Sequence, residues 1–315
     1  MNDKPTILIG PEPSKNPLNS GSWKWFGVDL ALELSKYYNI ITQKTRDDIK
    51  KADCYVVIKS LEFLKKIQDS GKNNTIYVPV DKLRHATELK LCAKHAALIT
   101  VLNNQNLYET HFKNAKNNHY AQYIPHHIKY FYDGHSYEER ESFIFWQGMQ
   151  GNYVYVKEYL NQNFIEENIR FAISGKERDP NKYWGTLDYV QWVDGDDYDR
   201  IHYPWIEERH AAFMQTCSGF LDIKGTDFHQ RYKPPTKVLD AIASGVPTAI
   251  NDCGVRDFMA SLGMNLAYPT DTEYWFSREY FDLTQQWKEI IRRDFHVEKV
   301  ALQYKEAIDF VVGVK

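Results

Sequence analysis

The stretch YKPPTKVLDAIASGVPTAIND, residues 232 to 252, carries the signals that decide the fold. Its two consecutive prolines suit the approach to a helix and its first turn, and the apolar residues after them recur at helical spacing. Gly245 stands where a left-handed residue ends a helix, and Pro247 prevents the helix from continuing. The stretch therefore predicts a short helix from Thr236, followed by a strand.

Short apolar runs alternate with helical patterns along the rest of the chain, which predicts βα units and mainly parallel sheets. We expect two Rossmann-like α/β domains facing an interdomain cleft: 1–135, then 136–283, with a helical segment 284–315 that packs back toward the first domain. The expected strands are 6–10, 54–58, 75–80, 97–103, 122–128, 143–148, 169–175, 189–195 and 218–224.

The composition indicates a soluble globular protein in a reducing compartment. The net charge of −3 gives no overall electrostatic reason to expect nucleic-acid binding. The four cysteines are widely separated and form no CxxC pair, so buried free thiols are expected. No apolar run suggests a signal peptide or a membrane span. We expect a cytoplasmic protein, with peripheral membrane association as the only contact with lipid.

The start of the predicted helix favours an anion. Unpaired backbone N–H groups, the helix dipole and Lys237 together would suit a diphosphate. Asp240 lies one turn deeper on the same face, where a carboxylate could accept hydrogen bonds from two ribose hydroxyls. The alternative is a tight turn with solvated lysines and an Asp240 bonded to a neighbour.

The motif KPPTKVLDAIASGVPTAI resembles the pattern K-P-x-K-x-x-E-A-x-A-x-G-x-P-V-(I/V) of GT-B glycosyltransferases, in particular the large retaining nucleotide-sugar family. WIEERHAAFMQTCSGFLDIK is similar to the helix and strand before that pattern. FIFWQG and IRFAISGKE are similar to the first two donor-domain strands, and the loop in NPLNSGSWKWFGVDL resembles the family's glycine-bearing loop.

The resemblance implies transfer of a hexose-type sugar from a nucleotide-sugar donor, a UDP- or GDP-sugar above all, to a hydroxyl acceptor. The acceptor would be a glycan, a lipid-linked molecule or another alcohol, and no cofactor or metal would be needed. The resemblance places the following residues against the donor: Gly21, Ser22, Gln147, Gly148, Gly175, Lys176, Arg231, Lys233, Thr236, Lys237 and Asp240.

One departure from the family pattern concerns catalysis. The family's paired glutamates would fall at Tyr232 and Asp240, so the first acid is missing and the retaining outcome is in doubt. Asp227, Asp222 or Glu208 could supply a substitute acid. The catalytic candidates are Asp81, His85 and Asp227, of which the first two follow an expected strand and suit acceptor activation or contact with the sugar.

Three other features have a simpler interpretation. The pair His126-His127 in a strand would point its rings to opposite faces, so we expect a structural role and no metal site. The run DGDDYD, residues 194–199, contains clustered carboxylates that could bind Mg²⁺, but we interpret it as a solvated loop. Glu12 follows the first strand, where inverting members place a base, yet an exposed turn residue is the simpler reading.

Three alternatives remain open at this point. The first is an inverting GT-B enzyme with an Asp or Glu base in the first domain, including transfer to modified DNA bases. The second is a sugar-nucleotide epimerase or hydrolase. The third is a non-catalytic nucleotide-sugar or carbohydrate-binding protein.

Overall fold

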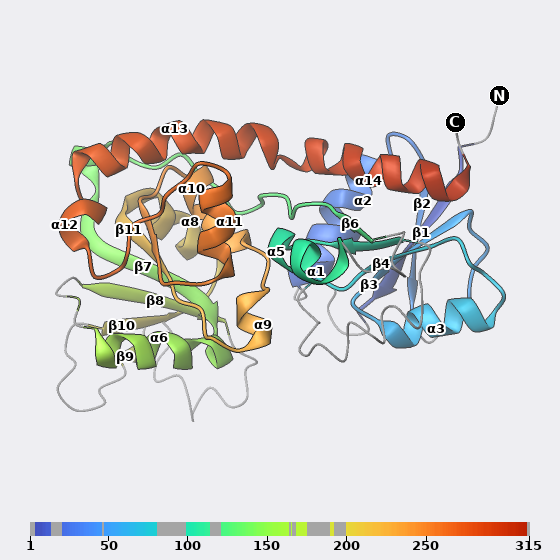
Figure 1. Cartoon of the computed structure of the whole chain (residues 1–315), viewed down its shortest axis with the longest axis horizontal. Coiled ribbons are helices and arrows are strands. Elements are labelled where there is room, and N and C mark those ends of the chain that lie inside the picture. Colours follow the sequence, from blue (N-terminus) through green and yellow to red (C-terminus); the bar gives the residue numbers. More distant parts are fainter. Residues whose placement is uncertain are drawn as a thin grey trace. The chain divides into compact units, whose positions relative to one another are not determined.

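The computed structural model describes residues 4–13, 21–45, 47–80, 99–113, 121–163, 165, 168–174, 190–191 and 200–313. The chain forms two compact units, each built around a six-stranded sheet (Figure 1). The first unit comprises Met1–Lys129, Asp227–Pro235 and Arg293–Lys315, and the second Tyr130–Thr226 and Thr236–Arg292. The chain thus changes unit at 129/130 rather than 135/136, and residues 227–235 group with the first unit.

The sheet of the first unit is parallel throughout, with the strand order β2-β1-β3-β4-β5-β6. β2 lies on one side of β1, whereas β3 and the strands that follow it lie on the other side. The neighbours β1 and β3 therefore form the switch point of this sheet. The strands are β1 (Thr6–Glu12), β2 (Asn39–Lys44), β3 (Cys54–Ile58), β4 (Thr75–Val78), β5 (Ile99–Leu102) and β6 (Ala121–Tyr123).

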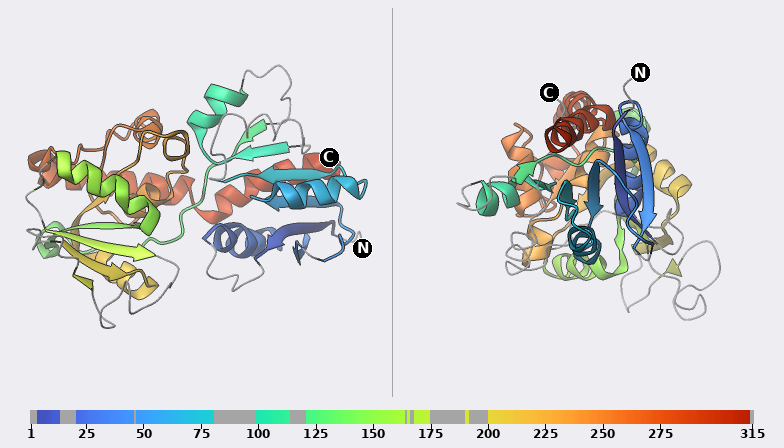
Figure 2. Two further views of the ribbon diagram at one scale, coloured as in Figure 1. Left: turned by 90° about the horizontal axis from the view of Figure 1, so that it is seen from below. Right: turned by 90° about the vertical axis from the view of Figure 1, so that its right-hand side faces the viewer.

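Alternation along β1 gives the first unit two apolar layers. Ile7 and Ile9 pack with the C-terminal helix α14 (Val297–Val312), whereas Leu8 packs on the opposite face with helix α3 (Leu61–Asp69). Figure 2 shows these two helices on opposite sides of the sheet. One face of α14 is buried, including Tyr304 and Ile308. The other helical segments of this unit are α1 (Gly21–Trp23), η2 (Lys24–Leu30), α2 (Ala31–Leu34), α5 (Gln105–Leu107), η3 (Tyr108–Phe112) and α9 (Phe228–Arg231).

The sheet of the second unit has the order β12-β11-β7-β8-β10-β9, and only β9 runs antiparallel to its neighbour. β8 and β10 lie on one side of β7. The later strands β11 and β12 lie on the other side. Its switch point therefore lies between β7 and β11. The strands are β7 (Glu141–Met149), β8 (Ile169–Ser174), β9 (Val190–Gln191), β10 (Arg200–Pro204), β11 (Cys217–Asp222) and β12 (Thr248–Ile250).

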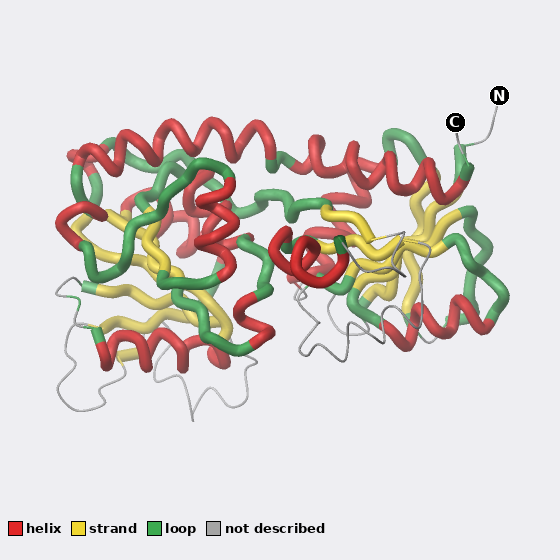
Figure 3. The backbone as a smooth tube through the Cα atoms, in the orientation of Figure 1, coloured by secondary structure: helices red, strands yellow, loops and turns green. Residues whose placement is uncertain are grey.

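Helices follow β7, β10, β11 and β12 in the second unit, and Figure 3 colours the helices red and the strands yellow. Phe143, Phe145 and Phe220 form part of its core, together with Met214 from α8 and Ala241 from α10. The two mainly parallel α/β sheets confirm the predicted fold class. The helical segments are η4 (Tyr137–Glu139), α6 (Gln150–Gln162), α8 (Glu207–Thr216), α10 (Thr236–Ala243), α11 (Gly254–Ser261), α12 (Thr272–Trp275) and α13 (Arg278–Asp294), the last ending two residues beyond the unit boundary.

The sequence prediction missed two strands, β10 and β2. The parallel strand beside β8 is Arg200–Pro204, whereas the expected run 189–195 contributes only Val190–Gln191, antiparallel. β2 was not predicted either, and it is the edge strand of its sheet. Only one of the six residues of β2 is fully buried, so its sequence is not continuously apolar. The prediction missed β2 for this reason.

Candidate functional site

Helix α10 begins and ends where the sequence predicts. It starts at Thr236 and is followed by Gly245 in the left-handed region with φ +71°. The Gly245 N–H donates to Ile242 O at 2.8 Å, and the Val246 N–H donates to Ala241 O at 3.0 Å. These two bonds form a Schellman motif, which satisfies carbonyls at the end of the helix.

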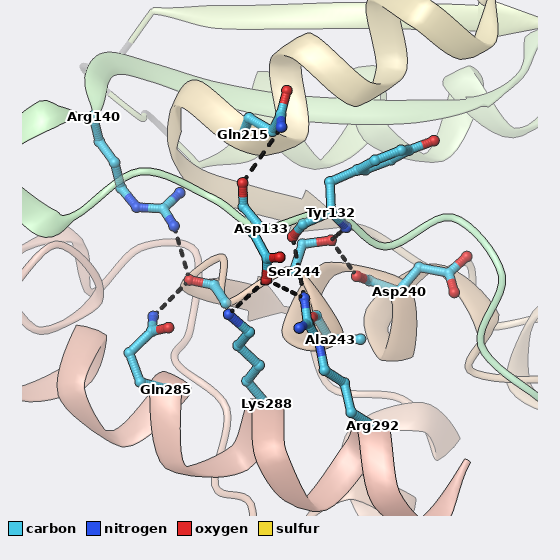
Figure 4. Close-up of polar contacts among 11 residues, drawn as sticks. Tyr132, Asp133, Arg140, Gln215, Asp240, Ala243, Ser244, Gln285, Lys288 and Arg292 are labelled. Carbon is cyan, nitrogen blue, oxygen red and sulfur yellow. Dashed lines mark hydrogen bonds and ion pairs between the residues drawn. The ribbon is translucent and has the colours of Figure 1, made fainter. Parts of the chain in front are cut away.

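Three side chains, two of them from α13, hold the end of this helix (Figure 4). Arg292 Nε donates to Ala243 O at 2.7 Å. Gly245 O accepts from Arg140 Nη2 at 3.0 Å and from Gln285 Nε2 at 2.8 Å. Two guanidinium groups thus meet the negative end of the helix dipole, which stabilises the helix.

A second set of contacts fixes the chain that enters the second unit. Asp133 Oδ1 lies 2.9 Å from Arg292 Nη2 and 3.2 Å from Lys288 Nζ, and hydrogen bonds from these two cations lower the pKa of Asp133. The Tyr132 N–H donates to Ser244 Oγ at 3.1 Å. Because the last turn of α10 is held in this way, the direction in which its first turn points is also fixed.

The first turn of α10 carries Lys237 to the switch point of the sheet. Lys237 Nζ donates to the carbonyl oxygen of Gln147, near the end of β7, at 2.6 Å. It lies 3.8 Å from Asp222 Oδ1, at the end of β11, and 5.0 Å from the centre of the Trp146 ring. The Lys237 ammonium is thus placed at the carboxyl ends of β7 and β11, where open α/β sheets bind their ligands.

The backbone beside this lysine has no room for a side chain. A Cβ atom at Gly148 would lie 2.6 Å from the Trp146 ring and 3.0 Å from Lys237 Nζ. The preceding residue, Gln147, is buried, and its Oε1 accepts from Trp205 Nε1 at 2.9 Å. A glycine at 148 therefore lets a ligand approach the main chain closely.

Behind Lys237 lies a buried ion pair. Asp222 Oδ2 is 2.7 Å from Lys224 Nζ, and the Asp222 and Lys224 side chains are 1% and 5% exposed. Sequence reasoning considered Asp222 only as a substitute acid and overlooked Lys224 and Trp146. The signal that could have revealed this ion pair is the sequence LDIK, residues 221–224. In it, two opposite charges lie two residues apart at the end of an apolar strand.

Asp240, the expected ribose ligand, is only 2% exposed. Its carbonyl oxygen accepts from Ser244 Oγ at 2.8 Å, while Figure 4 shows its carboxylate directed away from Ser244. Burial first, and then the nearby charges of Glu207 and Asp240, raise the pKa of Tyr132 to about 12. The ribose contact remains a prediction.

Several expected donor-site residues belong to the first unit. Gly21 and Ser22 open the helical stretch that leads into α2. Asp227 caps α9, accepting from the Gln230 N–H at 3.1 Å, and Arg231 is the exposed last residue of that helix. The carbonyl oxygen of Lys233 accepts from Asn104 Nδ2 at 3.0 Å. Gln147, Gly148, Thr236, Lys237 and Asp240 belong to the second unit.

Tyr232, which stands where the resembled pattern has an acid, packs within the first unit. Its hydroxyl lies 3.3 Å from His111 Nε2, and its ring lies 4.8 Å from that of Phe228, centre to centre. Burial lowers the pKa of His111. A neutral imidazole can accept a hydrogen bond from the tyrosine hydroxyl or donate one to it, according to which ring nitrogen carries the proton.

Four of the predicted site residues, Asp81, His85, Gly175 and Lys176, lie outside the described residues, as does the run 194–199. Glu12 is the last residue of β1, and its Oε2 accepts from Thr42 Oγ1 at 3.4 Å.

The expectation for the histidine pair was wrong in its geometry, because β6 ends at Tyr123 and the pair follows the strand. The rings of His126 and His127 lie 5.7 Å apart at 33° and are both buried, rather than pointing to opposite faces. His127 lies 3.4 Å from Asp29, and burial lowers the pKa of His127. Across the described ranges, no group of three or more His, Cys, Asp or Glu side chains is placed to hold a metal ion.

The sequence matches no protein-family model and no curated protein. The structure, in contrast, is similar to solved structures over nearly its full length. Sucrose-phosphate synthase from Thermosynechococcus elongatus has a TM-score of 0.65 at 11% identity, covering 99% of this chain and 100% of its own. HepE from Anabaena, solved with UDP and glucose, has a TM-score of 0.65 at 11% identity, covering 97% and 100%.

A third similar structure is the DNA-modifying enzyme β-glucosyltransferase, with a TM-score of 0.58 at 13% identity and coverage of 96% and 99%. This chain has the GT-B fold. Identities this low show the fold alone, because a fold supports many functions and function depends on the site. None of the helices in the described ranges has the length and hydropathy needed to cross a bilayer.

Proposed function

We propose that the protein is a GT-B glycosyltransferase that moves a sugar from a nucleotide-sugar donor to a hydroxyl acceptor. The observation that carries the proposal is the placement of Lys237. Its ammonium lies at the start of α10 and at the carboxyl ends of β7 and β11, beside the bare backbone of Gly148. A cation, a helix N-terminus and a close-approach glycine at one switch point suit a diphosphate.

The same groups account for the chemistry. When the bond between the anomeric carbon and the diphosphate oxygen breaks, negative charge builds up on the departing nucleoside diphosphate. Lys237 and the N–H groups of the first turn of α10 would stabilise that charge, so no metal is required. The acceptor oxygen forms the new bond to the anomeric carbon and loses its proton to a base. A UDP- or GDP-sugar is the proposed donor.

We propose retention of the anomeric configuration, as in the family that the α10 motif resembles. Tyr232, in place of an acid, is the observation that favours an inverting enzyme instead, with a carboxylate base in the first unit. Proton NMR of the product distinguishes the two, because the coupling constant of the anomeric proton reports its configuration directly.

A binding screen by native mass spectrometry tests the proposal. The full chain is mixed with UDP-, GDP-, ADP-, dTDP- and CMP-sugars, with and without EDTA. We expect saturable binding of at least one nucleoside-diphosphate sugar, unchanged by EDTA and displaced by inorganic pyrophosphate. Binding of none would contradict the proposed function, and binding abolished by EDTA would contradict its metal independence.

A further inference from the structure

Three charged side chains meet at the end of β11. Asp222 faces two ammonium groups, Lys224 Nζ at 2.7 Å and Lys237 Nζ at 3.8 Å. Neither carboxylate oxygen accepts a hydrogen bond of ordinary geometry from any residue that the structure describes. The buried pair of Asp222 and Lys224 is neutral by itself, and the partly exposed Lys237 adds one positive charge beside it.

The exposure of these three side chains increases from Asp222 through Lys224 to Lys237. The side chains of Asp222 and Lys224 are 1% and 5% exposed, whereas that of Lys237 is 23% exposed. An anion arriving from solvent therefore reaches Lys237 first, and Lys224 lies behind it. Lys224 lies closer to Asp222, and closer pairs attract more strongly.

The backbone of Lys224 is held rigidly. Its N–H donates to Asn251 Oδ1 at 2.9 Å, and its carbonyl oxygen accepts from Asn251 Nδ2 at 2.9 Å. This reciprocal pair ties the end of β11 to the residue that follows β12. The Lys224 side chain therefore extends toward Asp222 from a backbone position that Asn251 holds in place.

We propose that Lys224 is a positioning residue that occupies Asp222 and so keeps Lys237 available to a diphosphate. The proposal rests on the proposed function, because it names how the site's phosphate-binding cation is kept ready. Lys224 does not touch the donor. It acts by making the contact between Lys237 and Asp222 a long one, so that the Lys237 ammonium remains beside Gln147 O, at the end of β7.

Replacing Lys224 alone should therefore weaken binding at a distance. In Lys224→Met, Asp222 is left buried with Lys237 as its nearest cation, and it draws that ammonium into a close pair. We expect UDP and inorganic pyrophosphate to bind about tenfold more weakly, an effect of the size seen between contacting charged residues. Lys224→Arg, which keeps the charge, should bind within about threefold of the wild type.

The double variant Asp222→Asn with Lys224→Met separates positioning from structure. A neutral pair of similar volume removes the carboxylate that competes for Lys237, and such replacements of buried ion pairs are often neutral for stability. We expect the double variant to recover binding to within about threefold of the wild type. A merely structural role for Lys224 would not be rescued by removing its partner's charge.

Isothermal titration of the full chain with UDP and with inorganic pyrophosphate makes the test, with thermal unfolding as the check on folding. Weak binding by Lys224→Met and recovery in the double variant support the proposal. Unchanged binding by a folded Lys224→Met, or a double variant that binds tenfold more weakly than the wild type, overturns it. If Lys224→Met does not fold, the double variant alone decides.

The outcomes separate this proposal from the proposed function. If the wild type binds UDP and loses it in Lys237→Ala while Lys224→Met is unaffected, the proposed function stands and only the positioning role falls. If the wild type binds neither UDP nor pyrophosphate and no nucleotide sugar of the screen, both are overturned.

Discussion

Lys237 is the residue on which the candidate site depends. Replacing it with alanine removes the ammonium that lies at 2.6 Å from Gln147 O, at the carboxyl edge of the sheet. Hydrogen bonds to charged groups contribute about 1.5–3 kcal/mol, so we expect nucleotide-sugar affinity to fall roughly tenfold to a hundredfold. The fold should remain intact, because the side chain is partly exposed and its pair with Asp222 is long. Isothermal titration measures the affinity, and thermal unfolding measures the stability.

The control is Lys299→Ala, which removes an exposed lysine from α14. It should leave affinity and stability unchanged. If Lys237→Ala unfolds the protein, or binds as the wild type does, the phosphate-binding role of this lysine is wrong.

His210 gives the protein a pH-dependent stability. It is fully buried among aromatic rings, and neither ring nitrogen has a hydrogen-bond partner among the described residues. Burial lowers the pKa of His210 from 6.5 to about 3. The unfolded chain therefore binds a proton between these values and the folded chain does not, so stability is full above pH 6.5 and falls as the pH drops toward 3.

His210→Phe should remove this component of the pH dependence. We expect the wild type to lose about 2 kcal/mol more than the variant in its free energy of unfolding between pH 7 and pH 4.5, since each unit of pKa difference corresponds to about 1.4 kcal/mol. Urea unfolding at several pH values measures the slopes. His135→Phe, at an exposed histidine, is the control. Identical slopes for His210→Phe and the wild type would refute the assignment.

Sequence reasoning located residues of the site only where a backbone signal accompanied them. Lys237 and Gly148 stand beside a helix start and a strand end, which turn chemistry marks clearly. Trp146 has no such signal, since its contact with Lys237 joins residues 91 apart in the sequence. Contacts between distant segments are set by packing, which no local pattern encodes.

At the scale of elements, the contacts that hold the end of α10 can be tested by mutation. Arg292 donates to Ala243 O at 2.7 Å and pairs with Asp133 at 2.9 Å. Arg292→Met keeps the apolar stem but leaves that carbonyl and that carboxylate without the guanidinium. We expect a loss of about 1–3 kcal/mol in the free energy of unfolding and weaker nucleotide binding, because α10 carries Lys237.

The neighbouring Arg293→Met is the matched control. Arg293 is 68% exposed and pairs with Asp294, and exposed pairs contribute about 0–1 kcal/mol. Urea unfolding compares the two variants. Equal stability of Arg292→Met and Arg293→Met would show that the contacts in Figure 4 do not hold α10.

Buried parallel strands were the most predictable elements. The run CYVVI matches β3, whose five residues are all buried, because a strand covered on both faces is continuously apolar. The edge strand β2 (NIITQK) was missed for the opposite reason, because only one of its six residues is fully buried. The start and end of α10 were predicted correctly, since proline and glycine restrict the backbone regardless of tertiary context.

At the scale of the whole molecule, the fold persists at 11–13% identity across nearly complete chains. Apolar patterning and turn signals specify such a fold, and many sequences satisfy both. Which unit each segment joins is harder to predict. Residues 227–235 separate two elements of the second unit, yet Phe228 and Tyr232 pack against the apolar cluster of the first. Aromatic side chains in an otherwise polar connection are the physical cause.

The most direct test of the central claim, that a nucleoside diphosphate binds at the carboxyl edge of the second sheet, is hydrogen–deuterium exchange. The chain is compared with and without the nucleotide sugar that binds in the screen. We expect slower exchange in peptides covering 145–149, 222–226 and 236–240, which contain Gly148, Lys224 and Lys237. Unchanged exchange in these three peptides, with protection confined to other segments, would contradict the claim.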